Sequence, residues 1–166
     1  MLHDRSKTCF FTGHRNIPNA LAPSITSLLD GTIASLVYEG YDNFICGGAV
    51  GFDTLAACRV VVAKKHFPDI SFSLILPCRD QTARWNNAYD IALYQRLKGL
   101  ADSVEYASDI YSAGCMHSRN RMMADQSSVC VAYYNGRGGG TAYTVRYATE
   151  QGLRLINLYE KQKNSK

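Results

Sequence analysis

Two glycine-rich segments of this 166-residue chain have the composition of loops that bind phosphate groups. The first is Gly47-Gly48-Ala49-Val50-Gly51-Phe52-Asp53, and the second is Asn135-Gly136-Arg137-Gly138-Gly139-Gly140-Thr141. Glycine lets the main chain approach a ligand closely, and each segment precedes a predicted helix, whose first N–H groups attract anions. We therefore predict two loops that hold an anion, most simply a nucleotide phosphate. Thr141 either caps its helix or donates its hydroxyl to that phosphate. The first segment lacks the G-x-G-x-x-G spacing of dinucleotide-binding proteins.

Arginine and polar side chains accompany these loops. Thr12-Gly13-His14-Arg15 follows the first predicted strand, where the guanidinium of Arg15 is placed to bind a phosphate or carboxylate. The alternative is a turn glycine beside a surface arginine. Arg119 and Asn120 lie in the first turn of a predicted helix. Arg119 either reaches the same ligand, with Asn120 beside it, or belongs to a solvated basic helix. Asp53 either caps its helix or bonds a ligand hydroxyl or a neighbouring loop.

Aromatic and sulfur-containing side chains allow two interpretations. Trp85 lies four residues after Gln81 and four before Tyr89, so it either stacks on a nucleotide base or closes the core. The core role carries more weight for a lone tryptophan. Met116 and Met123 are expected to pack in the core.

Short apolar runs alternate with segments of helical periodicity along the whole chain. We predict strands over 8–12, 43–46, 71–76, 103–106, 128–134 and 154–158. We predict helices over 21–37, 53–65, 85–100, 115–125 and 141–151. This order predicts an α/β fold, a Rossmann-like doubly wound and mostly parallel sheet of about six strands with helices on both faces. Ligands of such sheets bind beyond the carboxyl ends of the strands, so the loops above should meet in one cleft.

Length and composition indicate one ordered domain. It should span 1–160, followed by a frayed basic tail over 161–166. The net charge of +4 falls to +1 without the last six residues, so a strongly basic nucleic-acid binder is not required. No apolar run reaches a membrane span and no signal peptide is evident, so we expect a cytoplasmic protein without membrane partners. The six cysteines are scattered, which favours reduced thiols and no metal site.

The ordered set of motifs resembles the SLOG superfamily, which joins the DNA-processing protein A family to the LOG-like nucleotide-processing proteins. It is most similar to the YpsA/YoqJ-like branch, once called DUF1273. The matching motifs are TGHR at 12–15, GGAVGFD at 47–53, P-x3-Q-x3-W at 77–85, MHSRNRMM at 116–123 and GGGT at 138–141. The resemblance implies a nucleotide-binding Rossmann-like fold, often in homo-oligomers.

One departure from the LOG pattern affects the predicted chemistry. LOG enzymes have a PGGxGTxxE motif whose glutamate serves hydrolysis of the N-glycosidic bond. Here the third residue after Thr141 is Thr144, and the nearest acid is Glu150. The resemblance therefore does not imply phosphoribohydrolase activity, and whether the protein is an enzyme stays open.

Three functions remain as hypotheses. The first is a sensor or regulator that binds a nucleotide or another phosphate-containing ligand and requires no further cofactor. The second is a nucleotide-processing hydrolase of an N-glycosidic or phosphoester bond, with Asp53 as carboxylate and His14 or His117 as acid–base groups. The third is a single-stranded DNA binder like DNA-processing protein A, which would show steep salt dependence.

Overall fold

Six parallel strands form one sheet in the computed structural model, which describes residues 3–164. The sheet order is β4-β3-β2-β1-β5-β6, so the direction of strand addition reverses between β1 and β5. The strands are β1 (Thr8–Gly13), β2 (Asn43–Cys46), β3 (Ser71–Cys78), β4 (Ser103–Ser108), β5 (Val129–Tyr133) and β6 (Arg154–Asn157). The predicted Rossmann-like doubly wound α/β fold is confirmed.

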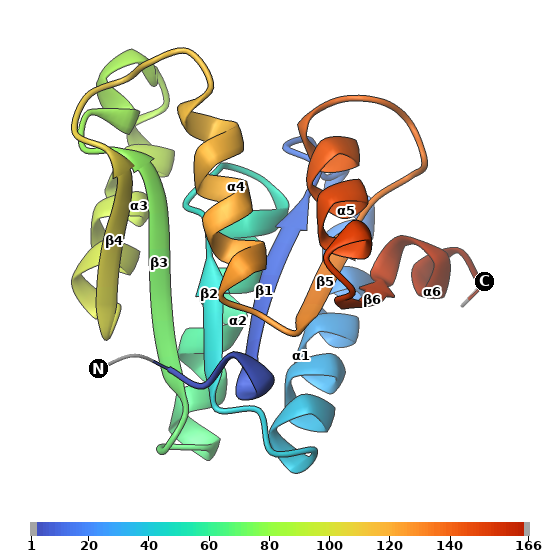
Figure 1. Ribbon diagram of the computed structural model, residues 1–166. Helices are drawn as coiled ribbons and strands as arrows, with labels where there is room; N and C mark the ends of the chain where they lie inside the picture. Colours follow the sequence, from blue (N-terminus) through green and yellow to red (C-terminus); the bar gives the residue numbers. More distant parts are fainter. Residues whose placement is uncertain (1–2, 165–166) are drawn as a thin grey trace.

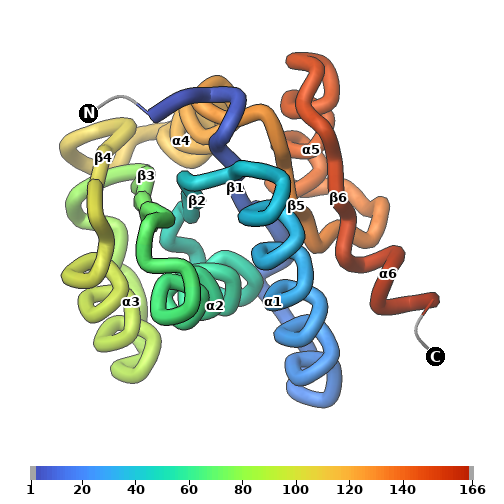
Figure 2. The backbone as a smooth tube through the Cα atoms, turned by 90° about the horizontal axis from the view of Figure 1, so that it is seen from below, coloured from blue at the N-terminus to red at the C-terminus, as the bar shows by residue number. Residues whose placement is uncertain are grey.

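Helices cover both faces of this sheet (Figure 1). The α-helices are α1 (Ala22–Tyr38), α2 (Phe52–His66), α3 (Ala88–Leu100), α4 (Cys115–Asp125), α5 (Gly140–Glu150) and α6 (Leu158–Asn164). Figure 2 shows α1, α2 and α3 on one side of the strands, and α4 and α5 on the other. Each face encloses its own apolar cluster, with Phe11 and Phe44 in the first and Phe10 and Ile45 in the second. The alternation follows from the two-residue period of strand side chains.

Proline did not end the third strand where we expected. β3 continues through Pro77 to Cys78, because the neighbouring β2 has already ended at Cys46, which pairs with Leu74. Pro77 therefore lies beyond the part of β3 that pairs with β2, in an edge-like position that tolerates proline, while Leu76 and Cys78 pair with β4 on the other side.

Two further boundaries differ from the prediction. The helix expected over 85–100 begins at Ala88, because the Asn87 side chain accepts the N–H of Asp90 at 3.1 Å and caps it. The tail expected to fray from residue 161 instead continues α6 to Asn164, with Gln162 buried. Residues 165 and 166 lie outside the described part of the chain.

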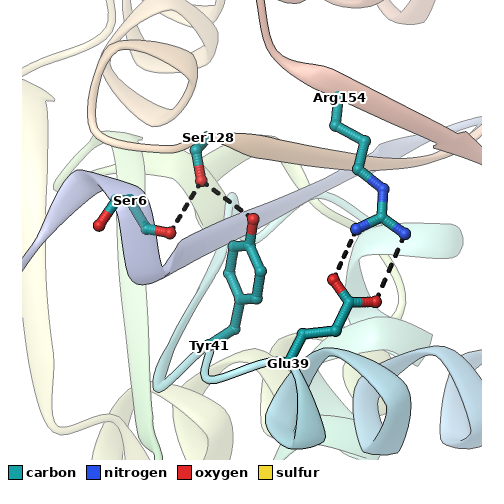
Figure 3. Close-up of polar contacts among 5 residues, drawn as sticks. All are labelled: Ser6, Glu39, Tyr41, Ser128 and Arg154. Atoms are coloured by element: carbon teal, nitrogen blue, oxygen red, sulfur yellow. Dashed lines mark hydrogen bonds and ion pairs between the residues drawn. The ribbon is translucent and has the colours of Figure 1, made fainter.

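Polar contacts at the amino ends of the strands join segments far apart in sequence (Figure 3). Arg154 of β6 pairs with Glu39 after α1, with nitrogen–oxygen distances of 2.6 and 3.5 Å. The Ser128 hydroxyl lies 3.3 Å from both the Ser6 carbonyl and the Tyr41 hydroxyl. These contacts hold the end of the sheet opposite to the predicted cleft.

One apolar helical segment departs from the expectation that no run reaches membrane-spanning length. Asn19–Tyr38 is long and apolar enough to cross a membrane by length and composition alone. In the fold, Ile25, Leu29 and Ile33 on one face of α1 are buried in the core beneath the sheet. Apolar helices that cover a sheet pass the same test, so the segment is weak evidence for a membrane span.

Glycine permits a close approach between the loop after β1 and the start of α2. A Cβ atom at Gly51 would lie 2.5 Å from the carbonyl carbon of Arg15, and one at Gly13 would lie 2.5 Å from the Phe52 ring. Gly51 also has φ +84°, a conformation that other residues rarely adopt. The two loops can therefore pack this closely only with glycine at both positions.

We predict that Gly51→Ala destabilises the protein by about 3–5 kcal/mol, because it combines left-handed strain with a backbone clash. The matched control is Gly136→Ala, where φ is +86° but no atom lies within 4 Å of the added Cβ. The control should cost only about 1–2 kcal/mol. Urea unfolding measures both, and equal costs would show that the close approach is not the constraint.

Candidate functional site

A cavity of about 300 Å³ opens at the carboxyl edge of the sheet, beside the end of β1, where the strand order reverses. Its walls come from the loop after β1, the start of α2, the first turns of α4, and the glycine loop before α5. The residues predicted for ligand binding that line it are Thr12, Gly13, His14, Arg15, Ala49, Asp53, Arg119, Asn120, Gly138, Gly139, Gly140 and Thr141. The predicted convergence of loops at this edge is therefore present in the structure.

The glycine loop before α5 forms one wall of the cavity as bare main chain. Gly138, Gly139 and Gly140 are exposed, and nothing lies within 4 Å of a Cβ added to any of them, so this stretch of main chain is open. Gly139 has φ +124°, and α5 begins at the next residue. The Asn135 side chain accepts the N–H of Arg137 at 3.0 Å and shapes the entry to the loop. An anion at this wall would meet free amides and the positive end of a helix dipole.

The two arginines of the cavity have different roles. Arg119 is only 4% exposed, and its guanidinium donates to the Gly47 carbonyl, to Asn120 Oδ1 at 2.6 Å and to Met116 Sδ at 3.7 Å. It therefore ties α4 to the loop after β2 while lining the cavity. Arg15 is exposed at the cavity wall, so its guanidinium can turn toward a ligand.

Asp53 is a buried carboxyl group at the base of the cavity. Its Oδ2 accepts the N–H of Ala49 at 3.4 Å, and it does not cap α2, whose N-cap is Gly51. Burial raises the pKa of Asp53 from its ordinary value of 3.8 to about 6, and the charge of Arg119 offsets only part of that rise. The capping interpretation is wrong, and the alternative of a bond to a neighbouring loop holds.

Two histidines line the cavity as well. His14 accepts the N–H of Asn135 through Nε2 at 2.9 Å, and its ring lies near those of Tyr133 and Tyr134. His117 packs edge-on against Tyr143, with ring centroids 4.1 Å apart. Sequence reasoning considered His117 only as an acid–base group. The available signal was its position in α4, two residues after the start of the helix and two residues before Arg119.

Some predicted residues lie beside the cavity and do not line it. A Cβ at Gly47 would lie 2.8 Å from Arg119 Nη1 and 2.9 Å from Asp53 Oδ2, so this glycine makes room for both side chains. Gly48 (φ +73°) faces Leu76 and Tyr94, and Gly51 faces Arg15. The first glycine segment thus permits tight packing, and Ala49 and Asp53 are its contribution to the cavity.

Trp85 follows the favoured interpretation, whereas Met116 does not. Trp85 packs edge-on against Tyr94 and against the first apolar cluster, which supports the core interpretation over base stacking. Tyr89 is 74% exposed. Met116 lines the cavity, whereas Met123 is buried in the core as predicted. Arg119 holds Met116 at the surface of the cavity through the contact with its sulfur.

A fold and a cleft of this kind define a Rossmann-like protein with a cavity at the topological switch point of its sheet. The model of the YspA SLOG family matches residues 11–160, and the chain belongs to that family. A similar protein is the uncharacterized SPbeta prophage-derived protein YoqJ of Bacillus subtilis, 29% identical over 82% of this chain and 90% of its own length. The UPF0398 protein SERP1017 of Staphylococcus epidermidis is 27% identical over 78% of this chain and 73% of its own.

Two solved structures of DNA processing protein A share the fold. The Helicobacter pylori protein, whose structure describes a single-stranded DNA binding mode, has a TM-score of 0.64 and 17% identity over 92% of this chain. The Streptococcus pneumoniae protein has a TM-score of 0.65 and 15% identity over 90% of this chain. This chain spans 65% and 49% of those two chains, respectively.

We predict that Asp53 makes stability depend on pH in the opposite sense to an ordinary paired carboxylate. Because its pKa rises from 3.8 to about 6 on folding, the stabilisation is complete below pH 4 and is lost as pH rises through 6. The unfolding free energy of the natural protein minus that of Asp53→Asn should fall by about 2–3 kcal/mol between pH 4 and 7.

Urea unfolding at several pH values measures this difference, with the exposed Asp69→Asn as control. Asp53→Asn also leaves Arg119 without its counter-charge. This changes the difference in unfolding free energy by the same amount at every pH, since arginine stays charged. A difference that rises with pH would contradict the assignment and show that the attraction to Arg119 outweighs burial.

Proposed function

We propose that this protein binds a small phosphate-bearing ligand, a nucleotide or a nucleotide derivative, and acts as a sensor or regulator. The observation that carries the proposal is one cavity that combines the exposed main chain of Gly138–Gly140, at the start of α5, with the exposed side chain of Arg15. Amides at a helix start together with an arginine match the charge and the acceptor oxygens of a phosphate group.

The base of the cavity supplies groups for the rest of such a ligand. Asp53 is an acceptor for a hydroxyl or an amino group. Asn120 uses its Oδ1 to accept from Arg119, which leaves its amide nitrogen to donate into the cavity. A ligand with a phosphate at one end and hydroxyl or amino groups at the other fits this distribution.

Binding without cleavage is favoured by the residue that stands where LOG enzymes have their glutamate. Thr144 is fully buried, and its hydroxyl donates to the Gly140 carbonyl at 3.0 Å within α5. This side chain has no carboxylate to stabilise an oxocarbenium-like centre. The hydrolase alternative would depend on Asp53, which is held by Ala49 and neighboured by Arg119.

Single-stranded DNA is the second candidate ligand, because the fold is shared with DNA processing protein A. An exposed arginine–aromatic pair outside the cavity favours it. Arg84 lies 5.3 Å from the ring centroid of Tyr111, which is 53% exposed beyond β4. Such arginine–aromatic pairs suit a backbone with stacked bases. An oligonucleotide should then bind with an affinity that falls steeply with salt, and Arg84→Ala should weaken it.

We predict that isothermal titration against adenosine, guanosine, cytidine and uridine 5′-monophosphates identifies a binder. Arg15→Ala should weaken it about 10–100-fold, the equivalent of one charge-assisted contact. The control is Arg79→Ala, an exposed arginine that pairs with Asp109 outside the cavity and should leave affinity unchanged.

Equal affinities in the natural protein and in both variants would contradict the assigned cavity. Native mass spectrometry of freshly purified protein adds the mass of any ligand that co-purifies. It also counts the subunits, which tests our proposal of a homo-oligomer.

A further inference from the structure

His14 makes three hydrogen bonds at the switch point between β1 and β5. Its N–H donates to the Tyr133 carbonyl at 3.2 Å, and its carbonyl accepts the N–H of Phe52 at 3.1 Å. Its ring nitrogen Nε2 accepts the N–H of Asn135 at 2.9 Å. One residue therefore joins the end of β5, the start of α2 and the glycine loop before α5.

The third of these bonds replaces a main-chain bond of the sheet. In a parallel ladder with Gly13 opposite Tyr133, the N–H of Asn135 would donate to the carbonyl of His14. That carbonyl is already used by Phe52, because the chain turns toward α2 at this point. The imidazole supplies the missing acceptor, and the ladder is extended by a side chain.

We propose that His14 is a positioning residue of the cavity, and that its neutral imidazole, with the proton on Nδ1, holds the glycine loop in its ligand-binding shape. The path from the ring to the loop is short. Asn135, bonded to His14 through its main chain, accepts the N–H of Arg137 with its side chain, and Gly138 follows. The consequence for affinity rests on the proposed function, whereas the hydrogen bond itself does not.

Protonation of His14 would break this contact. A charged imidazole carries a proton on both nitrogens, so Nε2 would face the N–H of Asn135 as a second donor. Charged and titratable groups around the same cavity are Arg15, Asp53, Arg119 and His117, and Tyr133 and Tyr134 lie beside the ring. If charge alone governed binding, protonation of histidine and Asp53 would strengthen anion binding at low pH. If protonation of His14 instead releases the glycine loop, anion binding should weaken at low pH.

NMR tests the contact without any ligand. The ¹⁵N shifts of the His14 ring should show Nε2 unprotonated at pH 8, and protonation on lowering the pH should move the Asn135 amide signal. In His14→Gln the side-chain oxygen can still accept the Asn135 N–H, so the exchange rate of that amide should stay near that of the natural protein. In His14→Leu it should rise about three- to tenfold, the equivalent of one hydrogen bond.

The matched control is His66→Gln, an exposed histidine at the end of α2, which should leave the Asn135 amide unchanged. A proton on Nε2 at pH 8 would overturn the proposal. Equal Asn135 exchange in the Gln and Leu variants would also overturn it. If the Leu variant fails to fold, the ring shifts of the natural protein and the Gln variant still decide.

Ligand affinity provides the functional readout. The phosphate of adenosine 5′-monophosphate itself gains a proton at about pH 6, so the readout is the difference between the two proteins. Affinity should fall from pH 8 to pH 5 by a larger factor in the natural protein than in His14→Gln. An equal change with pH in both proteins would overturn the role in binding. If the nucleotide does not bind at any pH while the NMR result stands, the proposed ligand is wrong and the positioning contact is retained.

Discussion

The close approach of the loop after β1 to the start of α2 is the constraint on which the cavity depends. Gly51 leaves no room for a side chain beside the main chain of Arg15, and Gly13 leaves none beside Phe52. Because the first approach is between main chains and the second is to a fully buried ring, together they fix the direction of the chain at His14 and Arg15. The carbonyl of His14 is thereby committed to α2, and its ring is free to hold the loop that follows β5.

A buried pair of opposite charges lies under this arrangement. Asp53 and Arg119 both flank Gly47, where a Cβ atom would touch each of them. Burial lowers the pKa of Arg119 and raises that of Asp53, so each charge is costly to the fold and each offsets part of the cost of the other. Since the two nearly neutralise each other, the net positive character of the cavity comes from Arg15 and from the main chain before α5.

The fold could be predicted because strands and helices have different apolar periods, and because the motifs stand at the ends of predicted strands. The cavity was largely predictable for the same reason, since parallel strands bring their carboxyl ends to one edge. The contacts of individual side chains were harder to predict from the sequence. The sequence does not reveal that Arg119 bonds to the Gly47 carbonyl, that Gly48 packs on Leu76, or that Trp85 turns toward Tyr94, because each depends on partners distant in the chain. The end of α6 was missed because burial of Gln162 is likewise a tertiary contact.

Amide chemical-shift mapping shows directly whether a phosphate-bearing ligand binds in the cavity at the carboxyl edge of the sheet. The ¹⁵N-labelled protein is titrated with adenosine 5′-monophosphate and, separately, with inorganic phosphate. We expect the largest shifts on Gly138–Thr141 and on His14 and Arg15. A second groove, between α1 and α2, is lined by Asp30, Tyr38 and Arg59 among others and should change little. Shifts confined to that groove, or no shifts with either compound at millimolar concentration, would contradict it.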